Sequence, residues 1–171
     1  MRSNKLLKIM YVFTWLAFIG LCIQSGILLT SYFFSFSNPD VSKKLFGGIN
    51  LFQYYNYSFY HYSFILFYKI MIGISEAWIA YLLIRLLKDL DIANPFNKSV
   101  CKLMKQTSIS ILCLWFIVML HNTHIQFIGK KYNFEMDLYS SEFLFVSGVL
   151  FIFSQIIKRG IEIQQENDLT I

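Results

Sequence analysis

The sequence is poor in charge. Only 15% of its 171 residues are Asp, Glu, Lys or Arg, whereas an ordinary soluble domain carries about 25%. No charged side chain occurs between Ile9 and Pro39, and 56% of the chain is hydrophobic. A soluble fold of this composition would need a core larger than a chain of this length can enclose. The composition therefore excludes a soluble globular domain and predicts an integral membrane protein.

The sequence also lacks the patterns of known catalytic and redox sites. Its three cysteines, Cys22, Cys101 and Cys113, are scattered and form no CxxC motif, so neither a disulfide framework nor a thiol-redox site is indicated. A nucleophile elbow, a phosphate-binding glycine loop and a dinucleotide fingerprint are all missing. We therefore expect a protein that is not an enzyme and that carries no cofactor.

Long apolar runs are what the sequence does contain. A hydrocarbon core about 30 Å thick needs roughly 20 helical residues, and only a helix satisfies its own backbone hydrogen bonds there. The first run is much longer than the roughly 7–15 residues of a signal-peptide core, so we expect an uncleaved span. The predicted fold is an all-α, integral membrane four-helix bundle forming one domain over residues 1–171. Its spans are about 9–33, 63–87, 105–127 and 138–158, with a tail at 159–171.

The fourth span is the shortest in apolar length. Only Phe143–Ile157 is free of charge, which covers about 22 Å at the helical rise. Starting the helix at Leu138 makes it long enough and places Glu142 at or below the headgroups.

The connectors carry recognisable turn and interface signals. Asn38-Pro39-Asp40 predicts a turn, and Asn94-Pro95 predicts a helix start within a short polar loop at 88–105. The segment 41–62 is dense in tyrosine and phenylalanine, which favour the headgroup level of a bilayer. We predict an interfacial, aromatic-rich connector on the outer face between the first two helices.

Basic residues predict the orientation. The cytoplasmic side of a membrane protein is enriched in Lys and Arg. Four lysines lie on one side of the predicted spans: Lys43, Lys44, Lys130 and Lys131. Ten basic residues lie on the other side: Arg2, Lys5, Lys8, Arg85, Lys88, Lys98, Lys102, Lys105, Lys158 and Arg159. Both termini are therefore predicted to be cytoplasmic.

Polar residues within the spans are the candidate functional residues, because such residues usually face the interior of a bundle. Steps of three or four place Lys69, Gly73, Glu76, Ala77 and Ala80 on one helix face. A second stripe holds Thr107, Ser110, Leu114, Ile117, His121 and His124. We predict that the two helices pack through these faces.

The depths of these residues predict one polar cluster. Lys69 and His121 each lie about 10 Å below the outer helix ends. The cluster would hold Lys69, His121, His124 and Glu142, with Glu76 deeper near the midplane. It could be a pocket for a small ligand or a protonation switch, since histidine titrates near neutrality. The alternative is that these side chains only snorkel, pair or anchor at the interface.

The histidines also raise the possibility of a metal site. His121 and His124, with His61 or Glu142 as a third ligand, have an ordinary helical spacing and no HExxH motif. We predict no metal here.

Three features of the sequence together resemble those of a known protein family. They are four spans in a short chain, Asn94-Pro95-Phe96 after the second span, and the ending Glu166-Asn167-Asp168-Leu169-Thr170-Ile171. This combination is similar to the bacterial membrane proteins grouped as domain of unknown function 2975. The resemblance covers nearly the whole chain and implies no established activity. It implies frequent genomic company with a small helix-turn-helix DNA-binding protein.

The implied genomic association with a DNA-binding protein suggests the first functional hypothesis. In this hypothesis the chain is a regulatory or sensory module that holds such a regulator at the membrane. The candidate contact residues are Asn94, Pro95, Phe96, Asp168 and Leu169. The positive charge is explained by topology and anionic lipid, so no direct nucleic acid binding is expected. The alternative is a small transporter or channel subunit with a polar path through Lys69 and Glu76, which would require a homo-oligomer.

Overall fold

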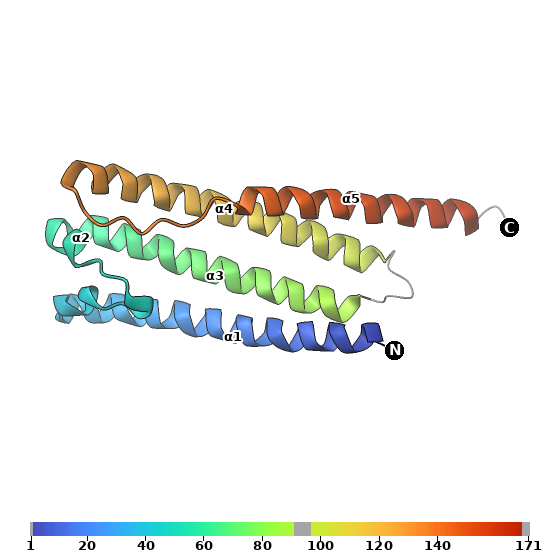
Figure 1. The fold of residues 1–171 in the computed structure, drawn as a ribbon, viewed down its shortest axis with the longest axis horizontal. Helices are drawn as coiled ribbons and strands as arrows, with labels where there is room; N and C mark the ends of the chain where they lie inside the picture. The colour runs from blue at the N-terminus through green and yellow to red at the C-terminus, as the bar shows by residue number, and fades with distance from the viewer. Residues whose placement is uncertain (1, 91–96, 169–171) are drawn as a thin grey trace. The chain divides into compact units, whose positions relative to one another are not determined.

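The chain is all-α in the computed structural model, which describes residues 2–90 and 97–168. Within these residues, four helices are long and apolar enough to cross a membrane, which confirms the predicted fold class and makes this a multi-pass membrane protein (Figure 1). They are α1 (Arg2–Ser37), α3 (Phe59–Asp89), α4 (Lys98–Tyr132) and α5 (Phe143–Asp168). Between α1 and α3 lie two short 3-10 helices, Pro39–Lys43 and Phe46–Gly48, and the short helix α2 (Phe52–Tyr57).

The described helices divide between two compact units. Unit 1 comprises Met1–Phe18, Ala77–Cys113 and Glu142–Ile171, and unit 2 comprises Ile19–Glu76 and Leu114–Ser141. Helices α1, α3 and α4 supply residues to both units, whereas α2 belongs to unit 2 and α5 to unit 1.

The core of unit 2 is formed by α1, the connector, α3 and α4. Its buried members include Leu28, Leu45, Tyr62, Leu66 and Ile125. The connector is compact: Ser42 O accepts a hydrogen bond from Leu51 N at 2.8 Å, and Leu45 N donates to Ile49 O at 2.9 Å. As predicted, Asn38 and Pro39 open a turn, because the Asn38 side chain accepts from the Asp40 amide at 3.0 Å.

Helix α3 approaches α1 closely within unit 2. A Cβ atom added at Gly73 would clash with the Ser25 Oγ atom of α1. Small residues allow this kind of approach in membrane helices, where apolar burial alone does not drive association.

Unit 1 contains a polar contact between α4 and α5. Ser108 Oγ donates to Ser147 O at 2.9 Å, and Ser147 Oγ donates back to Ser108 O at 2.9 Å. Cys101 Sγ donates to Ser154 O at 3.4 Å along the same pair of helices. Ser108 and Ser147 are buried, so the two helices meet through small hydroxyl side chains.

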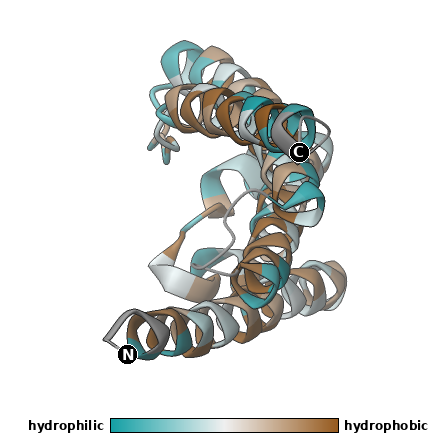
Figure 2. Cartoon of the chain, turned by 90° about the vertical axis from the view of Figure 1, so that its right-hand side faces the viewer, coloured by the Kyte–Doolittle hydropathy of each residue, from teal (hydrophilic) through white to brown (hydrophobic). Residues whose placement is uncertain are grey.

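Helix α1 exposes many large apolar side chains. Figure 2 shows that hydrophobic residues (brown) recur along this helix. Leu16, Ile23 and Phe33 are among those that the rest of the chain leaves uncovered. A membrane supplies the apolar surroundings that such a helix needs, whereas water would not.

One predicted boundary was wrong. Helix α5 begins at Phe143 rather than Leu138, so Glu142 precedes the helix instead of lying in its first turns. The helix start predicted at Asn94-Pro95 lies outside the described residues, and α4 is described from Lys98. Asn97 caps that helix, its Oδ1 accepting from Ser99 N at 2.8 Å.

Candidate functional site

The most elaborate polar structure in the described part of the chain surrounds loop 133–141, which follows α4 in unit 2. Asn133 adopts a positive φ of 55°, and Phe134 N donates to Gly129 O at 3.0 Å. A Cβ at Gly129 would lie 2.5 Å from Met136 Cγ. The chain therefore turns back sharply at Asn133 and lays the loop against the end of the helix it has just left.

A buried ion pair connects this loop to α3. The Lys69 side chain is 0% exposed, and its Nζ donates to Asp137 Oδ2 at 2.7 Å. The Asp137 side chain is 55% exposed. Lys69 Nζ also lies 4.9 Å from the centre of the Tyr139 ring, within range of a cation–π interaction. A buried ammonium is thus compensated by a carboxylate that solvent can reach.

Asn122 of α4 binds the backbone of the same loop. Its Nδ2 donates to Tyr139 O at 2.9 Å, and its Oδ1 accepts from Tyr139 N at 3.1 Å. His121 Nδ1 lies 3.2 Å from the same Oδ1. Because Oδ1 can only accept, Nδ1 carries the proton and Nε2 is a bare acceptor. Nε2 is buried and has no hydrogen-bond partner among the described residues.

Tyr139 lies at the centre of these contacts. Its ring packs edge-on against His121 with 5.0 Å between ring centres. Burial raises the pKa of the Tyr139 hydroxyl to about 12, and the negative charges of Asp137 and Glu76 add to the shift. Tyr139 therefore stays neutral at physiological pH and presents Lys69 with an aromatic face.

Helix α2 holds the beginning of the loop. Tyr54 Oη donates to Glu135 O at 2.7 Å, and Glu135 N donates to Gln53 Oε1 at 3.4 Å. Burial raises the pKa of the Tyr54 hydroxyl, and the charges of Asp137 and Glu135 act in the same direction. Tyr54 is therefore a hydrogen-bond donor under ordinary conditions.

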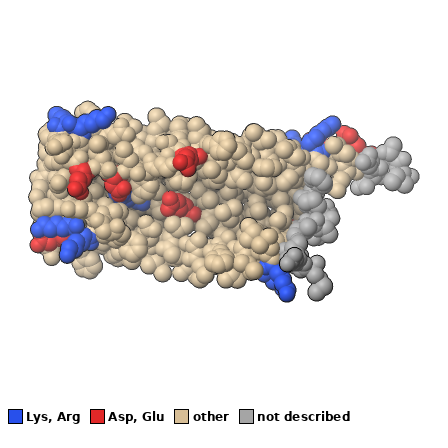
Figure 3. Space-filling model, viewed as in Figure 1, with Lys and Arg blue, Asp and Glu red and all other residues tan. Residues whose placement is uncertain are grey.

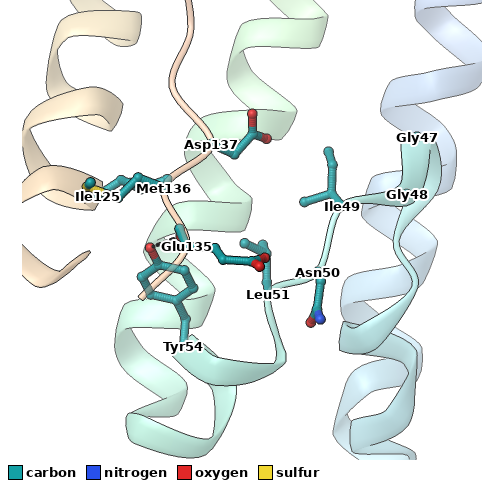
Figure 4. A pocket seen from close by; sticks show the side chains of 10 residues that line it. All are labelled: Gly47, Gly48, Ile49, Asn50, Leu51, Tyr54, Ile125, Glu135, Met136 and Asp137. Atoms are coloured by element: carbon teal, nitrogen blue, oxygen red, sulfur yellow. Dashed lines mark hydrogen bonds between the residues drawn. The ribbon is translucent and has the colours of Figure 1, made fainter. Parts of the chain in front are cut away.

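A cavity of about 520 Å³ opens between the connector and the loop (Figure 4). Its lining includes three residues with polar side chains that can bind a solute, Asn50, Glu135 and Asp137. Figure 3 shows several Asp and Glu side chains in this region, near α2. The lining residues are Gly47, Gly48, Ile49, Asn50, Leu51, Tyr54, Ile125, Glu135, Met136 and Asp137. Gly47 and Gly48 have φ of 77° and 78°, a conformation that favours glycine.

His124 pairs with His61, whereas His121 pairs with Asn122. His124 Nε2 lies 3.0 Å from His61 Nδ1 of α3, and the Tyr68 ring contacts both His121 and His124. Within the described ranges, no three His, Cys, Asp or Glu side chains are placed to share a metal ion.

The predicted cluster is thus assembled only in part. Lys69, His121 and His124 belong to unit 2 and are linked through Tyr139 and Tyr68. Glu76 is half-buried on α3, whereas Glu142 belongs to unit 1. Asn94, Pro95, Phe96 and Leu169 lie outside the described residues, and Asp168 is the last residue of α5.

Sequence reasoning missed four side chains that build the loop site. Asp137 and Tyr139 belong to the loop, whereas Asn122 belongs to α4 and Tyr54 to α2. The one usable signal was a buried lysine on α3, because such a charge needs a carboxylate and the loop after α4 offers Glu135 and Asp137.

A known protein family matches the greater part of the chain. Residues 43–171 match the family model described as protein of unknown function (DUF2975). The chain belongs to this family. Neither the curated proteins nor the solved structures gave a match. Membership in DUF2975 assigns no activity, so the function has to be argued from the site.

Proposed function

We propose that this DUF2975 protein is a non-enzymatic regulatory or sensory module of the bacterial inner membrane. Its receiving site is the cavity beside loop 133–141, and its output is contact with a small helix-turn-helix DNA-binding protein in the cytoplasm. The observation that carries the proposal is the ion pair between buried Lys69 and half-exposed Asp137, a residue that also lines the cavity.

The ion pair makes the loop sensitive to what enters the cavity. A cationic or hydrogen-bonding solute that engages Asp137 competes with Lys69 for its carboxylate. A buried ammonium that loses its partner is strongly destabilised. Binding in the cavity therefore favours a state in which the loop and α3 no longer hold their present contact.

Helix α3 is the physical link toward the output. It is one uninterrupted helix from Phe59 to Asp89, and it carries Lys69 in unit 2. Asp89 at its end accepts from Ser99 Oγ of α4 at 2.5 Å. We propose that a shift of α3 reaches the partner through the predicted polar loop at 88–105, whose candidate contact residues are Asn94, Pro95 and Phe96.

The carboxyl end offers a second contact surface. Helix α5 continues past the basic pair Lys158 and Arg159 to Asp168, with Ile163 45% exposed. This stretch mixes charged and apolar residues, and we propose it as a contact for the partner. The predicted contact residues Asp168 and Leu169 follow this stretch in the sequence.

Co-purification tests the output. The neighbouring DNA-binding protein should co-purify with the full chain from mild detergent and be lost on deletion of residues 161–171. Asp137→Asn should leave the association intact but change transcription from the regulator's promoter. Absence of any association in intact membranes would remove the proposal.

A transporter or channel subunit remains the second candidate. Glu76 is half-buried within a span and has no ion-pair partner among the described residues. Such a carboxylate is typical of ion pathways. Proton- or ion-dependent flux in liposomes that disappears with Glu76→Gln would favour it, and four spans would then require a homo-oligomer.

A further inference from the structure

A second cavity, unrelated to the loop site, lies between α1 and α3 in unit 1. Its volume is about 400 Å³. Two lysines, one from each helix, share it with a tyrosine and three aliphatic side chains. The lining residues are Leu7, Lys8, Tyr11, Val12, Leu87 and Lys88.

Both lysines are exposed, and neither belongs to any ion pair found among the described residues. Arg85, also exposed, lies one turn before Lys88 on the same face of α3. Lys8 is the last charge before the uncharged run of α1, which places it at the headgroup level of a bilayer. Basic side chains (blue) are visible beside the amino-terminal end of α1 in Figure 3.

An unbroken row of aromatic rings continues from this cavity along both helices. On α1, Tyr11 contacts Trp15 at 6.5 Å between ring centres and Trp15 contacts Phe18 at 5.7 Å. Phe18 then contacts Tyr81 of α3 at 6.3 Å, and Tyr81 contacts Trp78 at 5.6 Å. Trp15 and Trp78 are exposed, so the row is open to lipid.

We propose that this cavity binds an anionic phospholipid. Lys8 and Lys88 hold the phosphate, Arg85 adds attraction to a negative headgroup, and Tyr11 donates a hydrogen bond. The acyl chain lies along Val12, Leu87 and the aromatic row. Basic pockets between membrane helices at the headgroup level are the usual sites for such lipids.

The apolar continuation distinguishes a lipid from free phosphate. Inorganic phosphate would use the lysines and leave the aromatic row uncovered, whereas a phospholipid satisfies both parts at once. The charge is supplied from two helices rather than one, so the bound lipid also ties α1 to α3 within unit 1.

Native mass spectrometry of the whole protein tests the assignment. Phosphatidylglycerol is added to the protein in mild detergent, with phosphatidylcholine as the uncharged comparison. The double variant Lys8→Gln/Lys88→Gln is matched by Lys44→Gln/Lys130→Gln, which removes the same charge from exposed lysines of unit 2. We expect about tenfold weaker phosphatidylglycerol binding for the first pair and no change for the second, with 10 mM phosphate unable to displace the lipid.

A second readout follows the acyl chain. In the variant Trp78→Phe/Trp115→Phe, phosphatidylglycerol with brominated chains should quench Trp15 fluorescence. Adding Lys8→Gln/Lys88→Gln should shift that quenching to about tenfold higher lipid concentration. Equal binding of both lipids, equal losses in the two lysine pairs, or displacement by inorganic phosphate would each overturn the proposal. Thermal melting checks that every variant is folded.

Discussion

In unit 2 the buried polar side chains hold a loop in place, whereas in unit 1 they hold one helix against another. The loop site of unit 2 uses a full charge, Lys69 with Asp137, and side-chain bonds to backbone from Asn122 and Tyr54. The α4–α5 contact of unit 1 uses Ser108 and Ser147.

The comparison indicates which polar contacts contribute most to the stability of this protein. Hydroxyl contacts between membrane helices are worth little individually, because the separated helices also find partners. A buried charge is different, since losing its partner leaves an ion in an apolar environment. Single substitutions in the polar contacts of unit 2 should therefore lower the free energy of unfolding strongly, and those in unit 1 only slightly.

The largest effect is expected at the ion pair. Asp137→Asn should reduce the free energy of unfolding in detergent by about 2 kcal/mol, less than the roughly 3–5 kcal/mol of fully buried pairs because Asp137 is half exposed. Asp40→Asn breaks the surface pair with Lys43 and should have an effect below about 1 kcal/mol.

A double variant sharpens this result. Lys69→Met/Asp137→Leu removes both charges and should be more stable than Asp137→Asn alone, since no buried ion is left uncompensated. If the stability loss of the double variant equals the sum of the losses of Lys69→Met and Asp137→Leu, the two side chains act independently.

The next effect is expected at the close approach of α1 and α3. Gly73→Ala should lower stability by about 1–2 kcal/mol, because the new Cβ clashes with Ser25 Oγ. Gly26→Ala is the matched control, since nothing lies within 4 Å of a Cβ there. Similar melting temperatures for the two variants would contradict the close approach.

A smaller effect is expected in unit 1. Ser108→Ala removes one of the reciprocal bonds with Ser147 and should lower stability by about 0.6 kcal/mol, the typical value for such bonds in membranes. Thr14→Ala, whose hydroxyl bonds its own helix at an exposed position, should change the unfolding midpoint even less. A larger loss of stability for Ser108→Ala than for Asp137→Asn would contradict the contrast between the units.

The smallest effect is expected on the surface of α5. Glu162→Gln removes the exposed ion pairs with Arg159 and Lys158, and should change stability by less than about 0.5 kcal/mol. Its effect on capture of the DNA-binding protein can then be read without a stability correction, in the same co-purification assay.

The sequence predicts the spans well and the site only in part. Uncharged runs such as Ile9–Pro39 leave a helix as the one option in lipid, so four long helices were foreseeable. Lys69 was recognised because a charge within such a run stands out. Asp137 was not, because its pairing depends on how an irregular loop turns back at Asn133, and no periodicity records that turn.

One helix start was wrong for a related reason. The bilayer thickness suggested extending the fourth span to Leu138, whereas the residues before Phe143 belong to the loop after α4, with Tyr139 bonded to Asn122.

Amide hydrogen exchange of the Asp137→Asn variant tests most directly whether the ion pair holds loop 133–141 in place. The amides of Glu135 and Tyr139, which donate to Gln53 and Asn122, should exchange faster than in the unaltered protein. Amides around Ser108 and Ser147 should keep their rates. Unchanged exchange at Glu135 and Tyr139, or an equal increase in both units, would contradict the account.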